Sequence, residues 1–156
     1  MDILTTLTLT PHDKKSALLL WNTVYPAQLV FSTPDQFDSY LNGLAQKTHH
    51  IATKPTGEML AWAMTFEREK ETWFALIVGD KYQRKGIGKL MLQKIFASGT
   101  ELNGWVTDQN IYCRTDGAIY ESPLLFYLQN GFKIMPECRY ETALLSAVKV
   151  KWVPEQ

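Results

Sequence analysis

Residues 72–99 constrain the fold more than any other part of this chain, because a strand, a short turn and a helix follow one another there. Residues 73–78 form an unbroken apolar run of strand length, which predicts a strand that is buried on both faces. From residue 88 onward, the spacing of one helix face is occupied by Gly88, Met91, Leu92, Ile95, Phe96 and Gly99. A buried strand that leads into an amphipathic helix predicts a sheet with helices packed on it.

The turn between this strand and this helix predicts a site for an anion. Gly86 and Gly88 lie in or next to the first helical turn, where four backbone N–H groups lack partners within the helix. Glycine leaves room for a ligand near the backbone, and Arg84, Lys85 and Lys89 add positive charge at the positive end of the helix dipole. A phosphate fits such a site. The alternative is an ordinary tight turn with solvated lysines.

Two motifs resemble those of a known family. Gln83-Arg84-Lys85-Gly86-Ile87-Gly88 matches Gln/Arg-x-x-Gly-x-Gly/Ala, the signature of the GNAT N-acetyltransferases, and it follows a strand and opens a helix as in that family. About forty residues later, residues 126–132 (Phe-Tyr-Leu-Gln-Asn-Gly-Phe) are similar to the family's Phe-Tyr-x-x-x-Gly-Phe segment. The resemblance implies an α/β (α+β), GNAT-like fold with a mixed central β-sheet of about six to seven strands flanked by about four helices.

The resemblance also implies acetyl-CoA as the co-substrate and indicates which residues bind it. In the family, backbone N–H groups of the glycine turn bind the pyrophosphate, and the pantetheine arm enters a gap between two splayed strands, here 72–78 and 102–108. A bulge near residues 76–78 is expected to free backbone groups for this arm, with the Val78 N–H polarising the thioester carbonyl. The expected cofactor-binding residues are Leu76, Ile77, Val78, Gln83, Arg84, Lys85, Gly86, Ile87, Gly88, Lys89 and Tyr127.

Three residues are candidates for proton transfer. Tyr127 matches the tyrosine that many GNAT enzymes use as general acid toward the departing thiolate. A purely structural or cofactor-binding role for this tyrosine is the alternative. Some family members carry a glutamate six residues before the position of Val78, but this chain has Thr72 there. Glu71, which also fits a solvated hairpin tip, and Asp108 are therefore the candidate general bases, with an ordered water as a third option.

The rest of the chain alternates short strands and helices in a way that predicts one GNAT-like domain over 1–156. The expected element order is β-α-α-β-β-β-α-β-α-β-β. Strands are predicted at 3–9, 48–54, 59–66, 72–78, 102–108, 132–139 and 148–152, and helices from the capping signals at Thr10, Thr33 and Ser122 as well as after Gly86. A polar connector without clear periodicity spans 109–122, and such loops often shape binding sites.

Composition argues against several classes of function. Sixteen basic residues balance sixteen acidic ones, so no overall field favours nucleic acid or an anionic membrane. Cys113 and Cys138 are too few for a disulfide framework and do not have a metal-ligand spacing, and reduced thiols fit a cytoplasmic protein. No secretory signal and no apolar run near eighteen residues is found. We therefore expect no metal, nucleic-acid or membrane partner.

The sequence thus predicts an acyltransferase that moves the acetyl group of acetyl-CoA directly to a primary amine in a ternary complex. No cysteine lies inside either motif, so an acyl-enzyme is not expected. The acceptor is a small-molecule or peptide amine, with Trp62, Trp73, Trp105 and Tyr112 as a candidate aromatic pocket. The alternative, motivated by Thr72, is a non-catalytic CoA or acyl-CoA sensor or interaction module on the same fold. A nucleotide-binding protein is disfavoured because the third glycine of the dinucleotide fingerprint is missing. A homodimer remains open.

Overall fold

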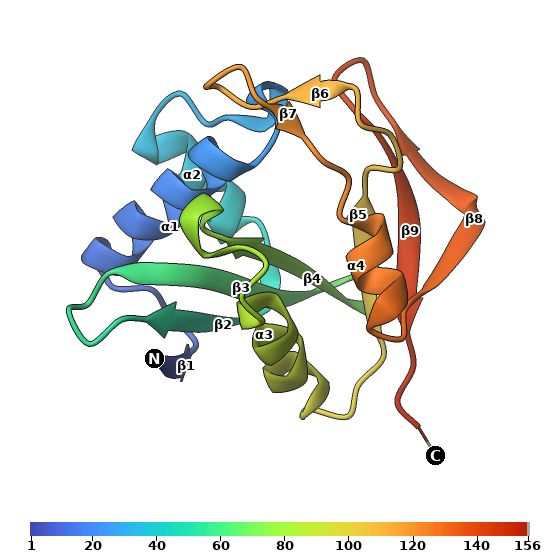
Figure 1. The fold of residues 1–156 in the computed structure, drawn as a ribbon. Coiled ribbons are helices and arrows are strands. Elements are labelled where there is room, and N and C mark those ends of the chain that lie inside the picture. The colour runs from blue at the N-terminus through green and yellow to red at the C-terminus, as the bar shows by residue number, and fades with distance from the viewer. Residues whose placement is uncertain (156) are drawn as a thin grey trace.

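Seven strands form one mixed sheet in the order β1-β2-β3-β4-β5-β9-β8 in the computed structural model, which describes residues 1–155 (Figure 1). The strands of this sheet are β1 Asp2–Thr6, β2 Ala45–Thr53, β3 Met59–Arg68, β4 Glu71–Val78, β5 Leu102–Val106, β8 Lys133–Glu141 and β9 Ser146–Trp152. The α-helices of the described residues are α1 Pro11–Val24, α2 Pro34–Asn42, α3 Ile87–Phe96 and α4 Leu124–Gln129. The predicted fold class is confirmed in both strand and helix number.

The two central strands β4 and β5 are parallel, and they separate after a single paired position. Trp73 pairs with Asn103, and no further pair is formed along the two strands within residues 1–155. A strand–helix–strand connection through α3 was expected to give this parallel pairing. On its other edge, β4 is paired with β3 along its whole length. The sheet therefore opens on one side of β4 only.

Helices cover both faces of the sheet (Figure 1). α1 and α2 pack on one face around Trp21, Phe37 and Trp62, and α3 and α4 pack on the other face. Capping fixes where the first two helices begin, because the Thr10 and Thr33 side chains accept hydrogen bonds from backbone N–H groups of the first helical turn. Both helix starts were predicted from the Thr-Pro pairs and are confirmed.

The structure corrects two predicted segments. The connector 109–122 contains a small hairpin, formed by β6 (Tyr112–Cys113) and β7 (Ile119–Tyr120), rather than irregular chain alone. The first strand ends at Thr6 instead of residue 9, and Leu7 beyond it is exposed. The pairing of the edge strand β8 with β9 shifts register between Met135 and Arg139, around Pro136, which has no N–H to donate to a neighbouring strand. None of the helices within residues 1–155 is long and apolar enough to cross a membrane.

Candidate functional site

A cavity of about 990 Å³ extends through the opening between β4 and β5. Its walls come from both faces of the sheet: the end of α1, the turn before α3, one side of α4 and the β6–β7 hairpin. The α3 side of the cavity contains the glycine turn, whereas aromatic residues form the α1 side. The cavity therefore joins the predicted anion site to a second, apolar compartment.

The edge of β4 that faces the cavity carries backbone groups that the sheet does not pair. The Val78 carbonyl accepts a hydrogen bond from Gln83 Nε2 (3.1 Å), and the Thr72 carbonyl accepts one from Asn103 Nδ2 (3.1 Å). Both carbonyls therefore point away from β3, toward the β5 side. Since the N–H and C=O of one residue point the same way and the direction alternates along a strand, Leu76 and Val78 also direct their N–H groups to this edge.

The predicted bulge near residues 76–78 is wrong. The register of β4 with β3 runs without a shift from one end of β4 to the other. The free backbone edge instead results from the divergence of β5, which leaves the β5-facing edge of β4 without a partner strand after Trp73. A ladder on one edge and a gap on the other produce the same unpaired N–H groups that a bulge was expected to supply.

The turn before α3 has the backbone conformation of an anion site. Gly86 is the N-cap of α3 with φ 83° and ψ 0°, and Arg84 also has a positive φ of 63°. A Cβ placed on Gly86 would meet no atom within 4 Å, so the space beside its backbone is open. Arg84, Lys85 and Lys89 are all exposed. Arg84 and Lys89 line the cavity at this end, next to the first-turn N–H groups that have no partner within the helix.

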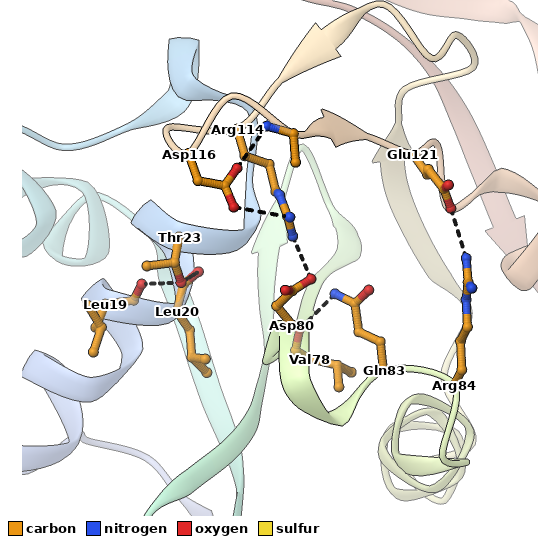
Figure 2. A network of polar contacts seen from close by, with 11 residues as sticks. Leu19, Leu20, Thr23, Val78, Asp80, Gln83, Arg84, Arg114, Asp116 and Glu121 are labelled. Atoms are coloured by element: carbon orange, nitrogen blue, oxygen red, sulfur yellow. Dashed lines mark hydrogen bonds and ion pairs between the residues drawn. The ribbon is translucent and has the colours of Figure 1, made fainter.

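Three residues of the motif have structural roles besides the cofactor contacts that were predicted for them. The Gln83 side chain holds the turn against the end of β4, as Figure 2 shows. A Cβ on Gly88 would lie 2.9 Å from Phe126 Cζ, so this glycine allows α4 to pack closely on α3. The Ile87 side chain is buried in the core. Their contacts with a cofactor stay predictions, and these would involve mainly backbone groups.

Tyr127 lies in α4 and lines the cavity. Its ring packs against Phe74 and Phe132, with centroids 5.5 and 5.3 Å away, and it is 6% exposed. Burial raises the pKa of Tyr127 well above its ordinary value, and the neighbouring Tyr120 adds to this effect. Burial likewise raises the pKa of Tyr120 to about 12. Both phenols therefore keep their protons at neutral pH and can act as hydrogen-bond donors.

The two predicted carboxylates lie outside the cavity lining. Glu71 accepts hydrogen bonds from Lys149 Nζ at 3.1 and 3.2 Å, near the far end of β4. Both oxygens of Asp108 accept hydrogen bonds from the Arg139 guanidinium, at 2.9 and 3.1 Å, and these bonds lower the pKa of Asp108. The structure therefore does not bring either carboxylate together with Tyr127.

Aromatic side chains line the α1 side of the cavity, the aromatic compartment, and two of the four candidate residues are among them. Trp73 and Trp105 line it, with ring centroids 5.1 Å apart. Trp62 is buried beneath the lining, and Tyr112 instead accepts a hydrogen bond from the Ser146 N–H. The remaining lining on this side includes residues that the sequence did not indicate: Trp21, Tyr25, Tyr40, Phe66, Arg68 and Tyr140.

The β6–β7 hairpin closes part of the cavity. Figure 2 shows Arg114, between these strands, reaching Asp80 at 2.5 Å, while its second nitrogen contacts Asp116 at 3.2 Å. Tyr120 of β7 places its ring edge-on to Tyr25 at the end of α1, with centroids 6.2 Å apart. These contacts connect the hairpin to the start of the glycine turn and to α1, so Tyr120 forms part of the wall between the two compartments.

A seven-stranded sheet that opens beside its central strand, with a glycine turn at the end of that strand, is the fold of the GNAT N-acetyltransferases. The chain is similar in fold to an aminoglycoside 6'-N-acetyltransferase complexed with coenzyme A, with a TM-score of 0.70, 16% identity, and coverage of 100% of this chain and 99% of the other. It is also similar to the ribosomal-protein-S18-alanine N-acetyltransferase from Escherichia coli, with a TM-score of 0.65, 18% identity, and coverage of 99% and 96%. An acetyltransferase of the GNAT family from Staphylococcus aureus gives a TM-score of 0.69 at 11% identity, with coverage of 97% and 98%. No protein-family model and no curated protein sequence matches the chain.

Proposed function

We propose that this protein is an N-acetyltransferase that transfers the acetyl group of acetyl-CoA to a primary amine in a ternary complex. The observation that carries the proposal is the single cavity that contains both the glycine turn and the unpaired edge of β4. A diphosphate at the turn would direct the pantetheine arm along β4. The N–H groups of Leu76 and Val78 would then be available to the arm and to the thioester carbonyl.

The chemistry requires one bond to form and one to break. The neutral amine nitrogen attacks the acetyl carbonyl carbon, and the C–S bond of the thioester breaks as the tetrahedral intermediate collapses. The departing sulfur takes up one proton, and the acceptor, which starts as an ammonium ion, loses two protons in total. Tyr127 is the proposed donor to the sulfur, because its phenol lines the cavity and keeps its proton at neutral pH. The phenolate left behind regains a proton from solvent, so the overall reaction releases one proton.

The residues that take the protons from the amine are not the predicted carboxylates in this proposal. Glu71 and Asp108 are both ion-paired and outside the lining. The carboxylates that do line the cavity, Asp80 and Glu121, are paired with Arg114 and Arg84. An ordered water that passes the proton to solvent is therefore the base we propose.

Support for the proposal also comes from the proteins of similar fold, one of which is complexed with coenzyme A. Their printed acceptors differ widely, from an aminoglycoside to an alanine of a ribosomal protein. The fold alone thus gives no acceptor for this chain.

Two measurements test the proposal. Isothermal titration with acetyl-CoA is expected to show binding at sub-millimolar concentration, and its absence would reject the cofactor site. Release of free thiol in the presence of an amine library then measures turnover. The lack of an unpaired carboxylate in the lining favours the second candidate, a CoA or acyl-CoA sensor, which would bind acetyl-CoA without any turnover.

A further inference from the structure

We infer that the aromatic compartment binds an amine acceptor that also carries a carboxylate, a short apolar peptide, with Arg68 as its anion-binding residue. This inference rests on the proposed function and names the substrate class of that site. The charged side chains of the cavity lining are the basis of this inference. Arg68 lies on β3 at the hairpin with β4, so it lines the cavity at the opposite end of β4 from the glycine turn.

Arg68 is the cation of this compartment that has no carboxylate partner within residues 1–155. No ion pair or hydrogen bond of its side chain is formed there, and its guanidinium instead lies over two rings, 5.1 Å from the centroid of Phe66 and 5.7 Å from that of Trp73. A guanidinium stacked on aromatic rings keeps its in-plane N–H groups free, and these match a carboxylate in a bidentate arrangement.

A second cation beside Trp73 strengthens the positive potential. Lys149 Nζ lies 5.3 Å from the centroid of the Trp73 ring, although both oxygens of Glu71 already pair with this ammonium group. Two cations and one carboxylate therefore surround the indole and leave a net positive charge. In this arrangement the Glu71 carboxylate neutralises the charge of the Lys149 ammonium group, and the Arg68 guanidinium stays available to a ligand.

The other charged residues of the lining belong to the opposite end of the cavity. Arg84 and Lys89 flank the glycine turn, and Glu121 pairs with Arg84. Asp80 and Arg114 pair with each other beside the same turn. A polycationic acceptor would find no unpaired carboxylate in the aromatic compartment, whereas an acceptor with one carboxylate and an apolar body would match Arg68 and the rings.

The length of β4 sets the scale of the acceptor. Trp73 precedes Leu76 by three residues and Val78 by five, which corresponds to roughly 10 to 17 Å along a strand. Allowing about 3 Å for the polar contact at each end leaves roughly 4 to 11 Å between amine and carboxylate. The amine and carboxylate of a free α-amino acid lie only about 3 Å apart, and each further residue of an extended chain adds about 3.5 Å, so this range corresponds to a dipeptide or a tripeptide.

The test compares matched acceptors that differ only in the carboxylate. The peptides Phe-Ala, Leu-Ala and Leu-Ala-Phe are each compared with the corresponding C-terminal amide, with acetyl-CoA in excess and thiol release as the readout. The wild-type protein is expected to show a KM for each acid about tenfold below that of its amide. Arg68→Gln should remove this preference, Arg68→Lys should restore part of it, and the Kd for acetyl-CoA should not change in either variant.

Lys70→Gln is the matched control, because Lys70 is an exposed cation of the same hairpin tip and does not line the cavity. It should leave the acid-to-amide ratio unchanged. A ratio near one in the wild-type protein, or a ratio that survives in Arg68→Gln, overturns the inference while acetyl transfer itself stands.

A second measurement separates this inference from the proposed transfer reaction. The quenching of tryptophan fluorescence by the same acids and amides, with coenzyme A present, reports binding without turnover, since Trp73 and Trp105 lie in the lining. Acid-selective binding that is lost in Arg68→Gln supports the inference even if no acceptor is acetylated. Equal binding of acids and amides in that assay overturns it.

Discussion

Replacing Gly86 by aspartate tests the anion site with one added charge. A Cβ at Gly86 would meet no atom within 4 Å, so the side chain can be accommodated without repacking. The positive φ of 83° strains any L-residue by about 1–2 kcal/mol, although Asp and Asn tolerate this region better than most residues. Gly86→Asn has the same size and the same strain, and it is therefore the control that leaves charge as the difference.

The expected magnitude follows from Coulomb's law. At about 5 Å, each pair of like unit charges costs roughly 0.8 kcal/mol at the dielectric constant of water and about 3 kcal/mol at an effective value of 20. Because Gly86 is exposed, the lower value applies. Two phosphate charges then give roughly 1.6 kcal/mol, which is about a fifteenfold difference in Kd.

Isothermal titration of acetyl-CoA into both variants measures this difference directly. Gly86→Asp is expected to bind about fifteenfold more weakly than Gly86→Asn, and this difference in Kd should narrow at 1 M salt, where the screening length falls to about 3 Å. Circular dichroism of both variants checks that they are folded. Equal Kd values in low salt would refute the reasoning, because they would mean that no phosphate lies near this turn.

Three further changes test the wall of the cavity and the core. Tyr127→Phe removes the proposed proton donor without changing the packing of the ring, so kcat for thiol release should fall about 100-fold and the Kd for acetyl-CoA should change far less; an unaltered kcat would exclude this role. Gly88→Val should lower the free energy of unfolding by about 1–3 kcal/mol in urea titrations, because the added atoms would collide with Phe126. Adding Phe126→Leu to this variant should restore part of the lost stability. A Gly88→Val variant with full stability would contradict this packing. His49, whose pKa is lowered to about 4 mainly by burial, is held neutral in the fold, so stability should be complete above pH 6.5 and should fall by up to about 3 kcal/mol as the pH drops toward 4. His49→Gln removes the titrating group but keeps an acceptor for the Trp62 N–H, so its unfolding free energy should depend less on pH, and an identical slope in the two proteins would contradict the assignment.

Local signals in the sequence account for the elements that were predicted well. The starts of α1 and α2 depend on a threonine side chain that accepts a hydrogen bond within the next turn, so a few consecutive residues determine them. The glycine turn is equally local, because its conformation depends on positive φ angles at Arg84 and Gly86. Signals of this kind can be identified without knowing what packs against the segment.

The β6–β7 hairpin was missed although a local signal was present. Asp116-Gly117 is a dipeptide that favours tight hairpin turns, and Gly117 has a positive φ of 86°. The flanking strands contain only two residues each, which is too short for an alternating pattern to stand out. Much of the hairpin's attachment comes from Arg114 and Asp80, which are far apart in sequence.

The gap in the sheet could be predicted only through the family resemblance, and its cause was predicted wrongly. A bulge is a property of two paired strands, whereas the observed opening depends on where β5 leaves β4. One close contact near this point is between Phe74 and Gly104, where a Cβ would lie 2.6 Å from the Phe74 ring. Glycine is thus required in β5 by a ring in β4, and nothing in the sequence near Gly104 indicates this.

The two halves of the cavity differ in how far their residues are separated along the chain, and this difference explains what the sequence could show. The proposed cofactor half is formed largely by the end of β4 and the turn that follows it, so one continuous segment contains its motif. The aromatic half combines the end of α1, α2, the β3–β4 hairpin, β5 and the β8–β9 pair. In sequence, Arg68 is one of several charges at a solvated hairpin tip, and only the register of β3 with β4 brings it to the same face as Trp73. Under the proposed function, acceptor specificity depends on contacts between distant segments, and the guanidinium of Arg68, which has no carboxylate partner within residues 1–155, is the feature that we propose distinguishes one class of amine from another.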